Sequence, residues 1–280
     1  MILITGAGGK TGRSLIKTLS NAESVCALVR HDEQVSTVKS LGAEKTVIGD
    51  MRDASVIRSA MTGTRAVYHI CPNMHPEEIL IGRLLIDEAR KAGVEHLVYH
   101  SVYHPQTEKM GHHWAKLRVE ELIFESGLPF TILQPAPYMQ NLLAEWKNIN
   151  ETGVLRIPYS AEAELSFVHL EDLAEAAKIV LTEGGHTYSI YEIAGTPPLS
   201  HNAVAEIFTE KLNRDVRAEK EDVKTWRVRN QGLGEYAMET LIKMFAYYDQ
   251  WGLPGNPRIL SWLLDREPVS LDRFIENLIT

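Results

Sequence analysis

The first twelve residues are Met1-Ile2-Leu3-Ile4-Thr5-Gly6-Ala7-Gly8-Gly9-Lys10-Thr11-Gly12, and this stretch is the strongest indication of the fold class. Residues 2–5 are apolar and typical of a buried strand, and an amphipathic helix is expected from about Thr11 to Ser20. The glycines therefore form the turn between a strand and the start of a helix. Backbone N–H groups and the helix dipole favour an anion at such a turn, and glycine lets a phosphate approach the backbone closely.

Two familiar phosphate motifs do not fit this turn. A Walker A loop needs a glycine five residues before Gly9, where the chain has Ile4. The G-x-G-x-x-G pattern would need a third glycine at Thr11. The spacing that does fit is Gly6, Gly9 and Gly12, with Gly8 as an extra glycine. Its place at the first β–α turn predicts a dinucleotide site; the alternative is a tight turn without a ligand.

Short apolar runs alternate with helical stretches through the first two-thirds of the chain. Strands are expected at 2–5, 24–29, 45–48, 66–70, 96–100 and 130–134. Helices are expected at 11–20, 35–41, 54–61, 77–92 and 114–126, and later at 171–182, 200–212 and 270–279. This alternation predicts an α/β protein with a doubly wound parallel sheet, the Rossmann fold.

After Pro135 the pattern becomes less regular, with further prolines at 137 and 158. We therefore expect residues 1–135 to form a dinucleotide-binding Rossmann domain to which 164–182 returns. Residues 136–163 and 183–280 are expected to form a smaller α+β lobe that binds the substrate, folded against the carboxyl edge of the sheet, where such folds bind ligands.

Composition narrows the class of protein. The 280 residues are 44% hydrophobic and 24% charged, with a net charge of -8, so nucleic acid is not an expected partner. The two cysteines, Cys26 and Cys71, lie in apolar runs and indicate a reducing compartment. With no apolar run of about 18 residues and no leader before the first strand, we expect a cytoplasmic protein with no membrane contact.

The end of the second strand indicates which cofactor is used. Proteins that prefer NAD place Asp or Glu there to bind the ribose 2′-hydroxyl. Here Val25–Val29 is followed by Arg30, and the next acid is Asp32. A guanidinium pairs with a 2′-phosphate, and Lys10 can add a second positive charge, so NADP(H) is predicted. The alternative for Arg30 is a solvated side chain.

Several segments together resemble the NmrA-like family, an atypical branch of the short-chain dehydrogenase/reductase superfamily. They are Ile4–Gly12, Leu28–Arg30, Gly49-Asp50, Lys116 with Glu120, Thr131–Pro135 with Asn141, Phe167–Asp172, and Asp265–Pro268 followed by Ser270 and Phe274. The resemblance extends along most of the chain. Members of this family include NADPH-dependent quinone reductases, triphenylmethane-dye reductases and NADP-binding regulators.

The resemblance implies cofactor roles for several of the matching positions. The glycine turn, from Gly6 through Gly8, Gly9, Lys10 and Thr11 to Gly12, would hold the pyrophosphate, and Arg30 the 2′-phosphate. Asp50 and Met51 would flank the adenine, and Cys71, Pro72 and Asn73 would pass under the cofactor. Lys116 would bind the nicotinamide ribose. Pro135, Ala136, Pro137 and Tyr138 would lie beside the nicotinamide.

Typical members of the superfamily use a Tyr-x-x-x-Lys pair and a serine for proton transfer. Here Ser101 ends the fifth strand and Lys116 lies on the next helix, but the tyrosine position holds His112. Residues four apart share a helix face, so His112 is a candidate proton donor. The alternatives are a surface histidine for His112, a polar strand end for Ser101 and a solvated lysine for Lys116. The neighbouring histidines lack a metal-ligand pattern, so no metal is expected.

Without the tyrosine, two functions remain open. The first is an NADPH-dependent oxidoreductase that transfers hydride to a quinone-like or other conjugated small electrophile, where positioning carries the catalysis. The second is a non-catalytic NADP(H)-binding redox sensor that acts through a protein partner. Nucleotide-sugar epimerisation is disfavoured, because it normally needs the tyrosine. A homodimer or a regulatory protein partner is compatible with either function.

Overall fold

The computed structural model describes residues 1–279, which divide into two compact units. The first unit contains Met1–Gln106, His112–Gln134 and Leu173–Glu192. The second contains Thr107–Gly111, Pro135–Asp172 and Ile193 onward. Residues 173–192 of the first unit overlap the expected returning segment 164–182 in part. They include most of a helix, Leu170–Thr182, and of a strand of the main sheet, Ser189–Ile193.

The first unit is built on a seven-stranded sheet with the order β3-β2-β1-β4-β5-β6-β9. Its strands are β1 (Ile2–Ile4), β2 (Val25–Val29), β3 (Lys45–Ile48), β4 (Ala66–His69), β5 (His96–His100), β6 (Phe130–Pro135) and β9 (Ser189–Ile193). The pairs from β3 across to β6 are all parallel. The doubly wound parallel sheet predicted from the sequence is therefore confirmed, with β9 as an additional edge strand that the sequence pattern did not reveal.

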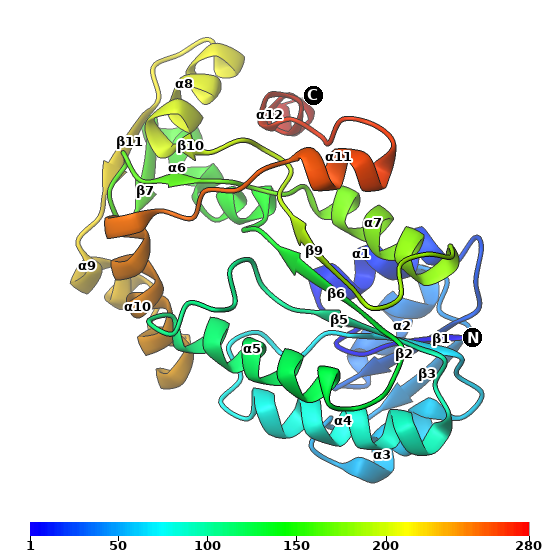
Figure 1. The fold of residues 1–280 in the computed structure, drawn as a ribbon. Coiled ribbons are helices and arrows are strands. Elements are labelled where there is room, and N and C mark those ends of the chain that lie inside the picture. Colours follow the sequence, from blue (N-terminus) through cyan, green and yellow to red (C-terminus); the bar gives the residue numbers. More distant parts are fainter. Residues whose placement is uncertain (280) are drawn as a thin grey trace. The chain divides into compact units, whose positions relative to one another are not determined.

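Helices cover both faces of this sheet (Figure 1). They are α1 (Lys10–Leu19), α2 (Glu33–Ser40), α3 (Ala54–Met61), α4 (Glu78–Ala92), α5 (Gly111–Phe124) and α7 (Leu170–Thr182). Helices α3, α4 and α5 lie on one face, and α1, α2 and α7 on the other. The strand order reverses between β1 and β4, where the chain crosses from one face to the other. In open α/β sheets, ligands bind at this point of reversal.

Apolar residues on alternate strand positions build the core beneath α3, α4 and α5. Leu3, Val67 and Leu97 come from adjacent strands and are fully buried. They pack with Ile57 of α3 and Leu85 of α4. Burying such side chains stabilises the fold by about 25 cal/mol per Å² of apolar surface. The core thereby fixes the carboxyl ends of the strands, from which the candidate site is built.

The second unit contains shorter elements. They are the 3-10 helix η1 (Met139–Glu145), α6 (Trp146–Thr152), β7 (Val154–Ile157), β8 (Glu164–Leu165), β10 (Leu199–Ser200), α8 (His201–Leu212), β11 (Arg217–Lys220), α9 (Val223–Arg229), α10 (Glu235–Trp251), α11 (Arg258–Leu264) and α12 (Leu271–Ile279). Strands β7 and β11 pair in parallel, and β8 and β10 pair antiparallel. This unit is therefore α+β, as predicted.

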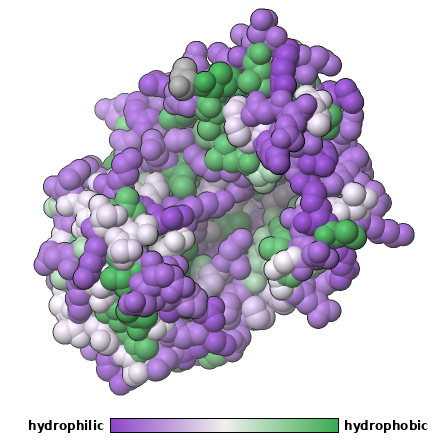
Figure 2. All heavy atoms as spheres, turned by 180° about the vertical axis from the view of Figure 1, so that it is seen from behind, coloured by the Kyte–Doolittle hydropathy of each residue, from purple (hydrophilic) through white to green (hydrophobic). Residues whose placement is uncertain are grey.

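Three further observations do not concern one unit alone. Within residues 1–279, no helix combines the length and the apolar character needed to cross a bilayer. On the face shown in Figure 2, hydrophilic residues predominate and hydrophobic residues form small separate groups. Cys26 in β2 and Cys71, two residues after β4, are both buried and form no disulfide. The cytoplasmic location stays a prediction.

Candidate functional site

The glycine turn follows β1 at the point where the strand order reverses. Gly6 has a φ of +59°, which is a left-handed conformation that other residues adopt at a cost. A Cβ at Gly6 would also lie 2.8 Å from the Ile70 carbonyl oxygen, at the end of β4. Glycine is thus needed here because the turn passes closely over the neighbouring strand.

Gly12 has a different role from the other glycines of the turn. It lies in the first turn of α1, and a Cβ there would be 2.6 Å from the Ala7 Cα atom and 2.7 Å from the Gly6 carbonyl oxygen. Gly12 therefore allows the helix to pack directly on the turn. The N-cap of α1 is Gly9, which has no side chain to cap this end. A helix start of this kind favours a bound phosphate.

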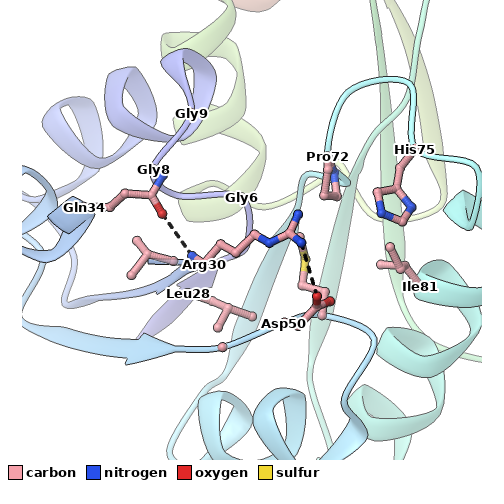
Figure 3. A pocket seen from close by; sticks show the side chains of 13 residues that line it. Gly6, Gly8, Gly9, Leu28, Arg30, Gln34, Asp50, Pro72, His75 and Ile81 are labelled. Atoms are coloured by element: carbon pink, nitrogen blue, oxygen red, sulfur yellow. Dashed lines mark hydrogen bonds and ion pairs between the residues drawn. The ribbon is translucent and has the colours of Figure 1, made fainter. Parts of the chain in front are cut away.

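A pocket opens beside this turn, entirely within the first unit (Figure 3). Its volume is about 230 Å³. Complete small-molecule sites measure roughly 300–1,000 Å³, so the pocket suits one part of a ligand, such as a nucleoside. The lining residues are Gly6, Gly8, Gly9, Leu28, Val29, Arg30, Gln34, Gly49, Asp50, Met51, Pro72, His75 and Ile81.

Arg30 and Gln34 form one wall of the pocket. The Gln34 Oε1 atom accepts hydrogen bonds from the backbone N–H groups of Arg30, at 3.0 Å, and His31, at 3.1 Å. The Gln34 side chain occupies the space that a Cβ at Gly8 would need. The Arg30 side chain is 55% exposed and extends across the pocket. Gln34 thus fixes the backbone from which an exposed guanidinium reaches the ligand space.

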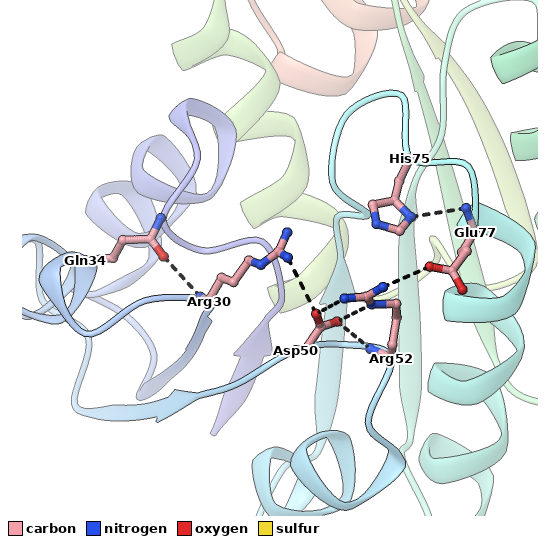
Figure 4. A network of polar contacts seen from close by, with 6 residues as sticks. All are labelled: Arg30, Gln34, Asp50, Arg52, His75 and Glu77. Carbon is pink, nitrogen blue, oxygen red and sulfur yellow. Dashed lines mark hydrogen bonds and ion pairs between the residues drawn. The ribbon is translucent and has the colours of Figure 1, made fainter. Parts of the chain in front are cut away.

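Asp50 lies opposite Arg30, at the end of β3 (Figure 4). Its Oδ2 atom is 3.7 Å from the Arg30 Nη2 atom and 2.7 Å from the Arg52 Nη2 atom. Arg52 Nε also donates to Asp50 Oδ1 at 3.1 Å, which makes the Arg52 pairing bidentate. The hydrogen bonds from Arg52 hold the pKa of Asp50 well below its usual value. The carboxylate is therefore charged, and its principal partner is Arg52 rather than Arg30.

His75 forms part of the opposite wall, in the segment between β4 and α4. Its Nδ1 atom accepts a hydrogen bond from the Glu77 backbone N–H at 3.1 Å. A neutral imidazole that accepts at Nδ1 carries its proton on Nε2. The Glu77 contact therefore makes Nε2–H of the neutral ring a hydrogen-bond donor at the pocket wall.

The pocket brings together seven of the predicted cofactor residues: Gly6, Gly8, Gly9, Arg30, Asp50, Met51 and Pro72. Other predicted residues of the first unit do not line it: Lys10, Thr11, Gly12, Cys71, Asn73 and Lys116. Pro135, Ala136, Pro137 and Tyr138 belong to the second unit. The cofactor roles of both groups stay predictions.

Lys116 lies in a buried ion pair. Its Nζ atom is 3.0 Å from Glu78 Oε1 and 3.3 Å from the His100 carbonyl oxygen. The Tyr99 hydroxyl donates to the same Glu78 oxygen at 2.9 Å. Burial alone would raise the pKa of Glu78, but the charge and the hydrogen bond of Lys116 lower it below its usual value. Glu78 therefore neutralises the lysine that was predicted to bind ribose.

Ser101 is likewise part of a buried network. Its hydroxyl donates to Glu120 Oε1, and Gln134 Nε2 donates to both oxygens of that carboxylate at 3.0 Å. Burial raises the pKa of Glu120, and the hydrogen bonds from Ser101 and Gln134 partly oppose this rise. Ser101 is 1% exposed. In this arrangement its hydroxyl stabilises a buried carboxyl group, which weighs against the predicted part in proton transfer.

His112 lies near the start of α5 and is buried. Burial is the main reason that its pKa falls to about 2, followed by the nearby His113 and the charge of Lys116. The ring is therefore neutral at physiological pH and has no labile imidazolium proton to donate. This result weighs against the proton-donor role and excludes the surface position considered from the sequence.

Sequence reasoning missed three informative pocket residues, Gln34, His75 and Ile81, and it gave Gly49 no role in the site. Gln34 had a local signal, because a glutamine in the first turn of a helix commonly accepts from the preceding backbone. Ile81 belongs to the apolar face of α4, which does not distinguish a core residue from a pocket residue. His75 lies in a segment without periodicity, and nothing in the sequence marks it.

The geometry can hold a phosphorylated nucleoside. The uncapped start of α1 favours a phosphate, and Arg30 offers a guanidinium across the pocket from Asp50. Leu28, Met51 and Ile81 provide an apolar surface for a planar base. These features suit a dinucleotide that carries an additional phosphate near its adenine.

Curated relatives match most of the chain. The NAD(P)H azoreductase of Xenophilus azovorans is 30% identical over 220 residues, which cover 78% of this chain and 76% of the relative. Quinone oxidoreductase 2 of Escherichia coli strain K12 is 25% identical over 283 residues, which cover 99% of this chain and 98% of the relative.

Solved structures agree with these relatives. The NADPH-dependent quinone oxidoreductase from Escherichia coli superposes with a TM-score of 0.86 at 25% identity, covering 100% of both chains. The triphenylmethane reductase of Citrobacter sp., complexed with NADP(H), superposes with a TM-score of 0.87 at 23% identity, covering 99% of both chains. The model of the NmrA-like family matches residues 1–276, and the chain therefore belongs to the NmrA-like family.

Proposed function

We propose that this protein is an NADPH-dependent oxidoreductase that transfers hydride to a quinone-like or other conjugated small electrophile. The observation that carries the proposal is the pocket beside the glycine turn, in which Arg30 lies across from a carboxylate already paired with Arg52. Two relatives that match most of the chain are named as an NAD(P)H azoreductase and a quinone oxidoreductase, and they support the same reaction class.

The residues of the first unit divide the work of binding. The glycine turn and the start of α1 would bind the pyrophosphate, and Arg30 would pair with the 2′-phosphate. Asp50 and Met51 would flank the adenine, and His75 would donate through Nε2–H to the adenosine moiety. Bound there, NADPH supplies a hydride from its nicotinamide ring.

Reduction of a quinone consumes one hydride and one proton. In the first unit, Ser101, His112 and Lys116 are all buried, and Ser101 and Lys116 are bonded to internal carboxylates. We therefore propose that solvent supplies the proton. The protein would contribute by binding and orienting the reactants, which can account for a large share of the barrier in hydride transfers.

The experiment is oxidation of NADPH by the purified protein, followed at the absorbance of the reduced nicotinamide, with a panel of quinones and azo dyes as acceptors. The expected result is turnover that requires an acceptor and is faster with NADPH than with NADH. If no acceptor stimulates oxidation although NADPH binds, the oxidoreductase proposal fails.

Ser101 and Lys116 are bonded to buried carboxylates. This arrangement also favours a second candidate function, a redox sensor that binds NADP(H) and acts through a protein partner. Such a sensor would bind the reduced and oxidised cofactors with different effects on the partner's affinity. Binding without turnover, together with this linkage, would favour the sensor. Turnover with any acceptor of the panel would favour the oxidoreductase.

A further inference from the structure

Two arginines share one carboxylate at the edge of the pocket. Arg52 binds Asp50 through two side-chain nitrogens, at 2.7 and 3.1 Å, and its backbone N–H donates to Asp50 Oδ1 at 2.9 Å. Arg30 approaches Asp50 only to 3.7 Å. Figure 4 shows the Asp50 side chain lying between the two guanidinium groups. Asp50 is therefore held by Arg52 and only weakly engaged by Arg30.

An ionised carboxylate at this position opposes the binding of a phosphate. Asp50 lines the pocket together with Arg30, so a phosphate that pairs with Arg30 comes close to Asp50. The pKa of Asp50 is held below its usual value, mainly by the hydrogen bonds from Arg52. Protonation therefore does not remove the charge at physiological pH. A neighbouring cation is the remaining means of offsetting the repulsion.

Arg52 is held in a position where its charge can offset the charge of Asp50. Its Nη1 atom lies 3.2 Å from Glu77 Oε2, next to the start of α4, while its other nitrogens bind Asp50 at the end of β3. Arg52 does not belong to the described residues that line the pocket. A planar guanidinium held at both ends fixes the carboxylate more firmly than a flexible ammonium would.

We propose that Arg52 determines the preference for a 2′-phosphorylated cofactor without touching it. By pairing with Asp50, Arg52 neutralises the carboxylate and keeps it from engaging Arg30, so that the Arg30 guanidinium is available to the phosphate. Arg52 is thus a positioning residue that acts through Asp50. This inference rests on the proposed function, because it concerns the same nucleotide pocket.

The test compares the dissociation constants of NADPH and NADH for the wild type, Arg52→Gln and the double variant Asp50→Asn/Arg52→Gln. The two cofactors differ only in the 2′-phosphate, so the ratio of the two constants isolates its contribution. Arg118→Gln is the matched control, because Arg118 pairs with Glu121 on the exposed side of α5 and its loss changes the net charge equally.

In Arg52→Gln, we expect the preference for NADPH over NADH to fall roughly three- to tenfold, the size expected for an uncompensated charge near the protein surface. The double variant should recover the wild-type ratio, because the repelling carboxylate is gone. Arg118→Gln should keep that ratio. Raising the salt concentration should reduce the effect of Arg52→Gln.

Three results would overturn this inference. An unchanged ratio in Arg52→Gln would show that Asp50 does not oppose the phosphate. Equal weakening of both cofactors would assign Arg52 a purely structural role. A double variant that stays impaired would mean that Arg52 acts on the phosphate directly. A wild type that binds neither cofactor would instead refute the proposed function, and this inference with it.

Discussion

The Lys116 ammonium lies 3.0 Å from the Glu78 carboxylate, and both side chains are buried in the first unit. The pair joins the start of α4 to the middle of α5 across the carboxyl end of β5. A lysine in this position is neutralised by its partner, so its first role is to satisfy a buried charge. If Lys116 contacts a cofactor ribose, it would have to do so while its ammonium group is paired with Glu78.

Removing the lysine should therefore cost stability. Lys116→Met leaves Glu78 buried without its cation, and we expect a loss of about 3–5 kcal/mol in the free energy of unfolding. The double variant Glu78→Leu/Lys116→Met should recover much of this loss, because no buried charge is left. Urea denaturation followed by circular dichroism measures both. Full stability in Lys116→Met would show that the pair is not formed in solution.

Ser101→Ala should change stability more than catalysis. The variant deprives Glu120 of one buried hydrogen bond, which should cost about 1–3 kcal/mol. Turnover measured with saturating cofactor and acceptor should fall far less than the 10²–10⁴-fold associated with the loss of a general acid or base. If turnover of a folded variant fell by 10²–10⁴-fold, the result would show that Ser101 takes part in proton transfer.

Two substitutions separate the functions of the two nitrogens of His75. Asn can replace Nδ1 as the acceptor for Glu77 N–H, whereas Gln can place a donor near Nε2. We expect His75→Gln to bind NADPH more tightly than His75→Asn, by roughly two- to tenfold for one hydrogen bond. Equal affinities in the two variants would assign His75 to supporting the segment alone.

The buried histidines predict how stability depends on pH. Burial lowers the pKa of His69 and His113 to about 4 and that of His100 to about 3. The unfolded chain takes up these protons below about pH 6.5, and the folded chain does so only below pH 4. Stability is therefore complete above pH 6.5 and decreases as the pH falls towards 4.

Each of these histidines should contribute up to about 1.4 kcal/mol per pH unit in that range. Urea midpoints measured at pH 7.5, 6.0 and 5.0 check the direction and the size. Replacing His113 with Asn should make the dependence shallower. A stability that rises on acidification would contradict the burial of these rings.

The sequence was sufficient to predict most of the first unit, because local patterns determine its elements. The apolar runs 2–5 and 66–70 match β1 and β4, and the glycine turn follows β1 as expected. Strand β9 was not predicted, because a five-residue edge strand after an irregular segment has a weak pattern. The second unit was predicted less completely, since many of its strands have only two to four residues.

The partners of the polar side chains could not be predicted in the same way. Lys116 and Glu78 are 38 residues apart, and Ser101 and Glu120 are 19 apart, so only the packing of α4 and α5 on the sheet brings them together. Family resemblance suggested a role for Lys116 but not the carboxylate that binds it. Nothing in the sequence marks Arg52, because its effect depends on the geometry of Asp50.

Arg30→Gln should remove the preference for the phosphorylated cofactor. Loss of a charge-assisted hydrogen bond should weaken NADPH binding by roughly ten- to a hundredfold, while NADH binding changes little. The two cofactors can be compared by fluorescence titration of the same sample. If NADPH binds the variant as tightly as the wild type, the additional phosphate is held elsewhere.

The most direct test of NADP(H) binding at the glycine turn is calorimetric titration of the wild-type protein with NADPH, with adenosine 2′,5′-bisphosphate as competitor. We expect one site per chain, a dissociation constant below about 100 μM, within the range usual for enzyme ligands, and displacement by the competitor. Absence of binding heat and of a fluorescence change at millimolar NADPH would contradict this site.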